Sequence, residues 1–318
     1  SGSKALTSAW PARPARRTRL RDHEGDASVT WVNTIIQGLL LGGLYALFAC
    51  GLSLMFGVMK VINLAHGDLA VVAAYLALGV VTVISIPAIW SFVVVVPIFA
   101  VVGYILQRTL IQASLDRGAL TTLLVTFGLS VVIENALLQF FSADSHSLDI
   151  GSLVTDSFNL GPHIQIAYLS LGIFVVAVVV LLGLQYFLSS TRHGRLIRAV
   201  ADDREAAQLC GADYRHVFGI AAAIAFATVA LAGIAFGMYS QFDPTIGTAQ
   251  LLLFAFEAVV IGGLGSLWGT LAGGIILGVV QQIGAQINPQ NQILAGQLVF
   301  LAVLVFLPQG ITGQRRTA

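Results

Sequence analysis

The sequence predicts an all-α, polytopic membrane protein, and its low charge content and long apolar runs are the observations that predict it. Of 318 residues, 57% are hydrophobic and only 10% are charged, whereas a typical soluble domain carries about 25% charged residues. Apolar runs of about 18 residues or more with almost no charge mark transmembrane helices, and such runs recur along this chain. A barrel would instead show strands that alternate apolar and polar residues.

Nine apolar blocks predict about eight or nine membrane segments, because one spanning helix needs about 20 residues. The first block is too long for one upright helix and too short for two, so it must tilt, kink or re-enter. Pro97 predicts a kink in the third block, since proline removes a helix hydrogen bond. The blocks cover residues 31–58, 69–84, 88–111, 120–141, 166–188, 218–239, 251–265, 267–286 and 293–307.

The composition divides the chain into three parts. Residues 1–30 are rich in Arg and Pro and predict a mobile tail. Residues 31–311 form the predicted membrane domain, which includes a long polar loop at 189–217, and residues 312–318 form a basic C-terminal tail. In the late apolar blocks, small residues recur four apart, as in Gly274 and Gly278, and this spacing predicts close packing of membrane helices.

The distribution of Arg and Lys predicts which loops face the cytoplasm. Loop 189–217 carries five arginines, whereas loops 142–165, 240–250 and 287–292 carry neither Lys nor Arg. Since positively charged loops stay inside, the polar loop and the C-terminus are expected in the cytoplasm. The side of the N-terminus stays open: counting spans places it outside, which we favour, and the arginines of the tail place it inside.

The stretch VINLAHGD interrupts the oily sequence with Asn63, His66 and Asp68. Asn63 is a good helix N-cap and Gly67 weakens a helix, so the stretch predicts a helix break whose polar groups satisfy free backbone atoms. Irregular backbone at membrane depth survives only where protein or water satisfies it. The break is therefore also a candidate lining of a translocation path, and the two roles are compatible. One His with one Asp does not predict a metal site.

Two carboxylates lie well inside apolar blocks, Glu134 and Glu257. A buried acid in a membrane is costly and is a functional candidate by default, although each side chain can also reach an interface from near a helix end. Asn135 adjoins Glu134 but faces another side of the helix. These three residues join Asn63, His66 and Asp68 as candidates for the substrate pathway.

Loop 189–217 is the most informative polar segment. Its part DREAAQLCGADY is rich in Ala and mixed charges, which predicts a short helix, read either as a solvated connection or as a docking helix for a cytoplasmic partner. The chain has only two lysines, Lys4 and Lys60, and neither follows Gly. A phosphate-binding G-x-x-x-x-G-K-[ST] loop is therefore missing from the sequence. With no HExxH or GxSxG motif either, we predict a protein that is not an enzyme and has no nucleic-acid partner.

The segment EAAQLCG at 205–211 resembles the EAA loop of bacterial ABC importer permeases, and Glu205, Ala206, Ala207 and Gly211 match its pattern. Ile220 comes one residue early, and the Leu-Pro that often follows is missing. The stretch from GLLLGGLYALFACG to INLAHGD, the stretch EAVVIGGLGSLWGTLAGGIILG and the late FLPQGITG are similar to the branched-chain amino acid permease subunits of ABC transporters. This resemblance covers residues 31–313.

The resemblance implies one permease subunit of an importer in the bacterial cytoplasmic membrane. It implies a second homologous permease subunit, two cytoplasmic ATPases that bind ATP and Mg, and an extracytoplasmic substrate-binding protein, with no cofactor in this chain. Residues 205–211 would form the helix that couples to the ATPases, with Arg195 and Asp202 in the same loop.

The resemblance also implies inverted repeats. Residues 31–84 and 218–261 each read as helix, polar break and helix, with breaks VINLAHGD and SQFDPTIG. Branched-chain or related amino acids are the expected substrates, and urea or short amides are an alternative. A proton-coupled carrier using Glu134 and Glu257, or a channel, would need no partner ATPase.

Overall fold

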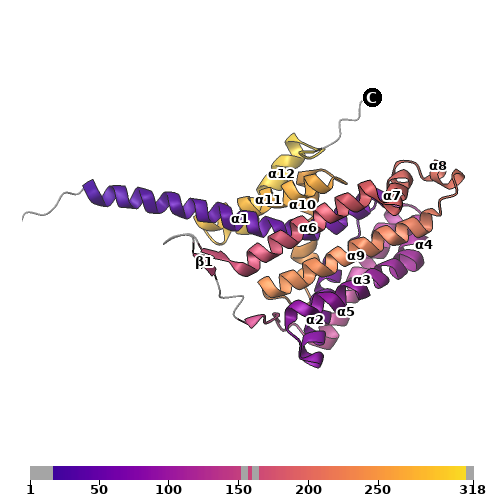
Figure 1. Cartoon of the computed structure of the whole chain (residues 1–318), viewed down its shortest axis with the longest axis horizontal. Helices are drawn as coiled ribbons and strands as arrows, with labels where there is room; N and C mark the ends of the chain where they lie inside the picture. The colour runs from indigo at the N-terminus through magenta and orange to yellow at the C-terminus, as the bar shows by residue number, and fades with distance from the viewer. Residues whose placement is uncertain (1–16, 152–156, 160–164, 313–318) are drawn as a thin grey trace, which may run out of the picture.

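The computed structural model describes residues 17–151, 157–159 and 165–312, with the backbone alone for 17–29 and 157–159. In these residues the protein is a helical bundle with one small hairpin (Figure 1). The longer helices are α1 (Arg17–Met59), α2 (His66–Ile84), α3 (Ser91–Leu106), α5 (Ala119–Phe141), α6 (Tyr168–Ser190), α9 (Tyr214–Tyr239), α11 (Leu267–Ile287) and α12 (Asn291–Phe306). The shorter elements are η1 (Ala88–Trp90), η2 (Gln107–Ile111), α4 (Gln112–Leu115), β1 (Ser157–Asn159), β2 (Gln165–Ala167), α7 (Arg192–Asp202), α8 (Arg204–Leu209), η4 (Gly247–Leu251) and α10 (Leu252–Gly262).

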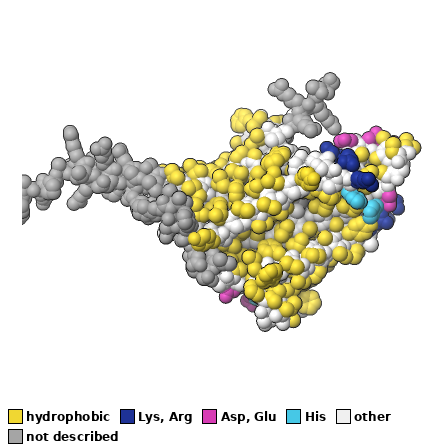
Figure 2. Space-filling model, in the orientation of Figure 1, with side chains coloured by type: hydrophobic (Ala, Val, Ile, Leu, Met, Phe, Trp, Pro, Cys, Tyr) yellow, Lys and Arg dark blue, Asp and Glu magenta, His cyan; other side chains and the backbone are white. Residues whose placement is uncertain are grey.

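The helices confirm the predicted polytopic, all-α class. Within the described residues, seven helices are long and apolar enough to cross a membrane, and two shorter apolar helices cover Gly247–Gly262 and Asn291–Phe306. Figure 2 shows hydrophobic side chains over the flank of the bundle and the Lys, Arg and His side chains gathered at one end. An apolar flank with charges at the end is what a bilayer requires of a bundle that spans it. The number of segments that cross the membrane stays a prediction.

We call the end formed by α7, α8 and the start of α9 the basic end. The N-terminal part of α1 lies at the opposite end, where Thr34 Oγ1 donates to Gln286 Oε1 (3.2 Å) and Gln37 Nε2 donates to the carbonyl of Gln165 (2.6 Å). Helix α1 starts at Arg17, inside the predicted tail 1–30, whereas residues 1–16 lie outside the described part. Most of the basic tail 312–318 lies outside it as well, so the division into domains stays a prediction.

Helix α1 is continuous to Met59, so the first apolar block does not re-enter. The break follows it, and Lys60 takes a positive φ of 58° where the helix ends. Helix α9 likewise ends at Tyr239 before a second break, and η4 with α10 follows. The chain thus contains two similar halves, α1 to α5 and α9 to α12, joined by the hairpin and α6 to α8.

The two halves exchange their packing partners. The most extensive helix contacts are those of α1 with α11 and of α3 with α9, so the first helix of each half packs against the third helix of the other half. Each half on its own would leave these faces without a partner. The breaks that follow α1 and α9 are consequently brought together inside the bundle.

Small residues allow α1 and α11 to approach closely, as the glycine spacing predicts. A Cβ atom at Gly42 would lie 2.5 Å from Ile275 Cα and 2.7 Å from the carbonyl oxygen of Gly274. Both are backbone atoms, which cannot move aside without separating the helices. By contrast, a Cβ atom at Gly79 of α2 would meet no atom within 4 Å among the described residues.

We expect Gly42→Ala to destabilise the protein by about 1–3 kcal/mol, because overpacking a tight interface forces backbone shifts. The matched control Gly79→Ala puts the same methyl group on a helix in open space and is expected to be neutral or slightly stabilising. Thermal denaturation of the purified protein in detergent measures both. Equal midpoints for the two variants would contradict the observed packing.

Candidate functional site

The two breaks fold in the same way although their sequences differ. In the first, the Asn63 Oδ1 atom accepts a hydrogen bond from the Ala65 N–H (3.1 Å). In the second, the Asp243 Oδ1 atom accepts one from the Thr245 N–H (2.9 Å). Such side-chain turns replace backbone hydrogen bonds where a helix is interrupted. Asn63 and Asp243 are 180 positions apart (243 − 63), which is also the separation of Asp68 and Thr248.

The helix after the first break is α2, and the helix after the second break is η4 continued by α10; we call these two the half-helices. They meet at their N-terminal ends. A Cβ atom at Gly67 would overlap the carbonyl group of Gly247, and one at Gly247 would overlap Asp68. Glycine is therefore required at both positions by the close approach of two backbones. Helix N-terminal ends carry partial positive charge. Two such ends facing each other are stabilised by the carboxyl group of Asp68 in the first turn of α2.

Asp68 organises a buried polar cluster that joins three helices. Its side chain is fully buried, and the Thr248 hydroxyl donates to its two oxygens at 2.8 and 2.9 Å. The Ser130 hydroxyl of α5 also donates to Asp68 and lies 2.9 Å from the Thr248 hydroxyl. One turn earlier on α5, Thr126 Oγ1 accepts the N–H of Leu64 (3.2 Å). Helix α5 thus contacts the first break and the polar cluster.

An apolar pocket of about 280 Å³ lies beside this cluster. Thr248 belongs to both features, since its side chain also lines the pocket. The walls come from the first break, α5 and the half-helix that follows the second break. The lining residues are Ile62, Leu64, Leu123, Thr248, Leu252, Leu253 and Phe256. Thr248 supplies the one polar side chain in this lining.

The structure places the predicted residues of the first break around the pocket but not in it. Asn63 and His66 are buried, and His66 Nε2 lies 2.9 Å from the Phe48 carbonyl of α1. This contact attaches the start of α2 to the middle of α1. Asn63 holds the turn, so the pocket is lined by its apolar neighbours Ile62 and Leu64.

The other predicted pathway residues lie apart from the polar cluster. Glu134 is partly exposed on α5, and Asn135 is exposed and donates to the Val131 carbonyl (2.8 Å). Glu257 on α10 is 1% exposed, and neither of its oxygens has a hydrogen-bond partner in the described part of the chain. No hydrogen bond or ion pair among the described residues joins Glu134 to Glu257. The described residues contain no group of three or more His, Cys, Asp or Glu side chains that could hold a metal ion.

The polar loop contains two helices, α7 and α8, and the second confirms the short helix predicted from its Ala-rich sequence. Asp203 caps α8, since its Oδ1 accepts from the N–H groups of Glu205 (2.9 Å) and Ala206 (3.0 Å). Gly211 ends the segment with a φ of +88°. Leu209 on α8 is an apolar side chain that is 90% exposed in the described part of the chain.

The remaining predicted residues of the loop divide by exposure. Those that are exposed are Arg195, Asp202, Glu205, Ala206 and Gly211, whereas Ala207 is buried. Asp202 is the last residue of α7 rather than part of α8.

A charged network at the basic end links α8 to α5. Asp116, just before α5, contacts Arg204 of α8 (3.3 Å) and Arg215 of α9 (3.4 Å) through its two carboxylate oxygens. The Arg204 guanidinium also stacks 3.7 Å above the Tyr214 ring. Asp116 therefore ties the polar loop to the helix that carries Ser130.

Sequence reasoning did not single out Ser130, Thr248 or Asp116. Isolated hydroxyl residues are common in membrane helices, and Asp116 lies in an ordinary-looking turn. Aligning the two breaks would have found Thr248, because VINLAHGD and QFDPTIGT superpose with Gly67 on Gly247 and Asp68 on Thr248.

Comparisons with known proteins find a family of transport permeases. The family described as "Branched-chain amino acid transport system / permease component" matches residues 34–308. The high-affinity branched-chain amino acid transport system permease protein BraD of Pseudomonas aeruginosa is 31% identical over 299 residues, covering 89% of this chain and 96% of BraD. The permease protein LivH of Escherichia coli K12, of the same description, is 26% identical over 298 residues, with the same coverage.

A more distant relative is named for a different substrate. The fructose import permease protein FrcC of Rhizobium meliloti is 31% identical over 220 residues, covering 65% of this chain and 59% of FrcC. No solved structure matches the chain significantly.

We expect Thr248→Val to destabilise the protein by about 1–3 kcal/mol, because a buried carboxyl oxygen then loses its donor. The matched control Thr82→Val removes an exposed hydroxyl that bonds only to its own helix, at the Leu78 and Gly79 carbonyls. Thermal denaturation in detergent compares them. A Thr248→Val protein as stable as the control would show that the cluster does not hold the half-helices together.

Proposed function

Because the chain belongs to the family of permease components of branched-chain amino acid transport systems, we propose that it forms one half of an ATP-driven importer for branched-chain amino acids. The observation that carries this proposal is the apolar pocket beside the meeting point of the two half-helices. In many transporters the substrate binds near the bilayer midplane, where broken helices of inverted repeats meet.

The chemistry of the pocket favours an aliphatic amino acid over the alternatives. Its walls are apolar except for Thr248, so they suit a branched side chain better than urea, a short amide or a sugar. The Thr248 hydroxyl, which Asp68 holds from behind, is the polar group that this lining offers to the polar end of an amino acid. A volume of about 280 Å³ is close to the lower limit of ordinary ligand pockets, which suits a small substrate.

The basic end would face the cytoplasm, since five arginines lie in its loop. The described start of α1 then lies outside and Thr312 lies inside, in the cytoplasmic membrane of a bacterium. Of the two partner ATPases, which bind ATP and Mg, one would dock on α8 of this chain, where the apolar side chain of Leu209 stands exposed. A second permease subunit and an extracytoplasmic binding protein complete the proposed importer.

The contacts at Asp116 supply a route from the ATPases to the pocket. A displacement of α8 would be transmitted through Arg204 to Asp116 and then to α5. Helix α5 carries Thr126 and Ser130, which hold the first break and Asp68. Movement of α5 would therefore alter the relative position of the two half-helices and the shape of the pocket beside them.

We expect Leu252→Ala to lower the initial rate of ATP-driven leucine import about tenfold, because a lost methylene contact in an apolar pocket is worth 10–200-fold. The control Leu298→Ala removes the same atoms from an exposed position on α12. Radiolabelled leucine uptake into proteoliposomes holding the full complex measures both. Import without ATP would contradict the proposed function, and equal rates for the two variants would contradict the role of the pocket.

We expect Asp116→Asn to lower the amount of leucine imported per ATP hydrolysed by about fivefold. A change of this size corresponds to a loss of roughly 1 kcal/mol in the contacts that Asp116 makes. The complex should still assemble, because partly exposed ion pairs contribute little to stability. Asp144→Asn, at an exposed position of the opposite end, is the control. An unchanged transport-to-hydrolysis ratio in Asp116→Asn would remove this residue from the proposed route.

A further inference from the structure

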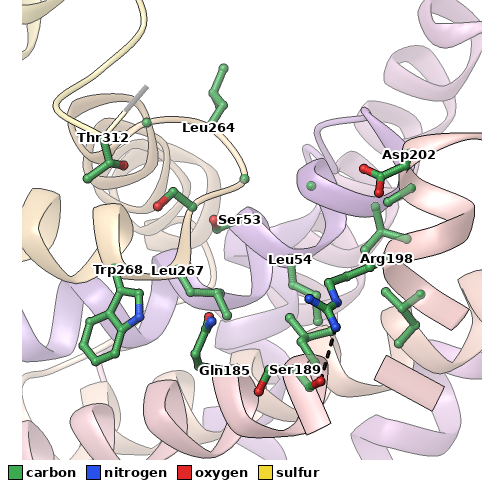
Figure 3. A pocket seen from close by; sticks show the side chains of 18 of the residues that line it. Ser53, Leu54, Gln185, Ser189, Arg198, Asp202, Leu264, Leu267, Trp268 and Thr312 are labelled. Atoms are coloured by element: carbon green, nitrogen blue, oxygen red, sulfur yellow. Dashed lines mark hydrogen bonds between the residues drawn. The ribbon is translucent and has the colours of Figure 1, made fainter. Parts of the chain in front are cut away.

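A second cavity, of about 500 Å³, opens at the basic end and shares no residue with the apolar pocket. Its walls come from the end of α1, the end of α6, helix α7 and the turn that leads into α11. Figure 3 shows Arg198 and Asp202 of α7 on one side of this cavity and Leu267, Trp268 and Thr312 on the other.

One wall carries a polar side chain with no protein partner. Ser53 of α1 is fully buried and lines the cavity, and its hydroxyl makes no hydrogen bond to any described residue. A buried hydroxyl without a partner costs about 1–3 kcal/mol. A bound ligand in the cavity would supply the missing partner.

The cavity also offers donors for a carboxylate. Helix α11 begins here, and Ser266 caps only the Gly269 N–H with its hydroxyl (3.1 Å). The N–H groups of Leu267 and Trp268 make no hydrogen bond to the described residues. Lys60 and Arg198 add two positive charges to the lining. A helix N-terminal end flanked by cations is a suitable place for an anionic group.

The remaining lining suits the rest of an amino acid. The Asp202 side chain makes no hydrogen bond or ion pair with the described residues, so its carboxylate is free to receive an ammonium group. Leu54, Leu188 and Leu267 give the cavity an apolar wall. Cationic, anionic and apolar groups in one cavity match a zwitterion with an apolar side chain better than a simple anion.

We propose that this cavity is a second, regulatory site that binds a free apolar amino acid from the basic end and slows transport when the amino acid accumulates there. The identity of the ligand and the cytoplasmic location of the cavity rest on the proposed function. The transported product would then limit its own import.

The position of the cavity explains how occupancy would act. A ligand held by Arg198 and Asp202 on one side and by the start of α11 on the other would bridge α7 to the core of the bundle. Helix α7 is followed by α8 after a single residue, Asp203. Restraining α7 therefore restrains the helix on which the ATPases would dock.

The test uses the full complex in proteoliposomes, with ATP inside and the binding protein and radiolabelled leucine outside. Vesicles are preloaded with unlabelled leucine or with sucrose of equal osmolarity, and initial import rates are compared for each protein. We expect internal leucine to slow import by the wild type several-fold. In Ser53→Ala, the internal leucine concentration that halves the rate should rise about fivefold, since one hydrogen bond is lost.

Leu188→Trp fills the cavity from α6 and should make import insensitive to internal leucine. The matched control Leu182→Trp places the same ring on the exposed face of α6 and should remain as sensitive as the wild type. Import that proceeds at the same rate with and without internal leucine would overturn the proposal. Inhibition that persists unchanged in Ser53→Ala and Leu188→Trp would overturn it as well, because the inhibitory site would then lie elsewhere.

A direct binding measurement separates this proposal from the proposed function. Equilibrium dialysis of the complex in nanodiscs, without binding protein, reports radiolabelled leucine bound to the wild type and to Leu188→Trp. If leucine is not imported but binding is present and is lost in Leu188→Trp, the proposed function fails and the cavity assignment holds. If leucine is imported but Leu188→Trp binds as much leucine as the wild type, the proposed function holds and the cavity assignment fails.

Discussion

The structure depends on the contact between the N-terminal ends of two half-helices inside an apolar bundle. Backbone polar groups at membrane depth must be satisfied within the protein, because hydrocarbon offers them no partners. Here the side chains of Asn63 and Asp243 each accept one backbone N–H of their break, and Asp68 accepts hydrogen bonds from the hydroxyls of Thr248 and Ser130. The glycines at 67 and 247 let the two backbones come close enough for these bonds to form.

The exchanged packing of the two halves follows from the same contact. Helices α1 and α9 contact each other, and the third helix of the other half covers each of them. The tight α1–α11 interface at Gly42 is therefore not an independent feature of the fold. It holds in place the helix from which the first break begins.

The sequence predicted the helices and the first break well, because both depend on local composition. A run of apolar residues by itself indicates a membrane segment, and the polar residues Asn63, His66 and Asp68 stand out within such a run. The partners of Asp68 could not be predicted in this way. Ser130 lies 62 positions away from it with no local signal, and Thr248, 180 positions away, is found only when the second break is aligned with the first.

Glu134 and Glu257 stand out in the sequence, but the sequence could not predict how deeply each side chain is buried. Their charge in an apolar block attracts attention, but burial depends on helix orientation, which the tertiary packing decides: Glu134 is partly exposed and Glu257 is fully enclosed. In the loop, the EAA pattern located α8 correctly. It did not reveal Asp116, because the contacts of Asp116 with Arg204 and Arg215 span 88 and 99 positions.

If the apolar pocket binds the substrate as proposed, the position of Thr248 would join selection of the substrate to the switch between conformations. A ligand can shift an equilibrium between two conformations only by as much as its affinities for them differ. A pocket built on one rigid element would bind the ligand equally well in both conformations and would not shift the equilibrium between them. The pocket here is shared by the first break, α5 and the second half-helix, so any displacement of α5 changes its walls and the bonds of Thr248 to Asp68 together. A substrate bound in this pocket would therefore have an affinity that depends on the relative position of the half-helices, which is the condition that an alternating-access transporter must meet.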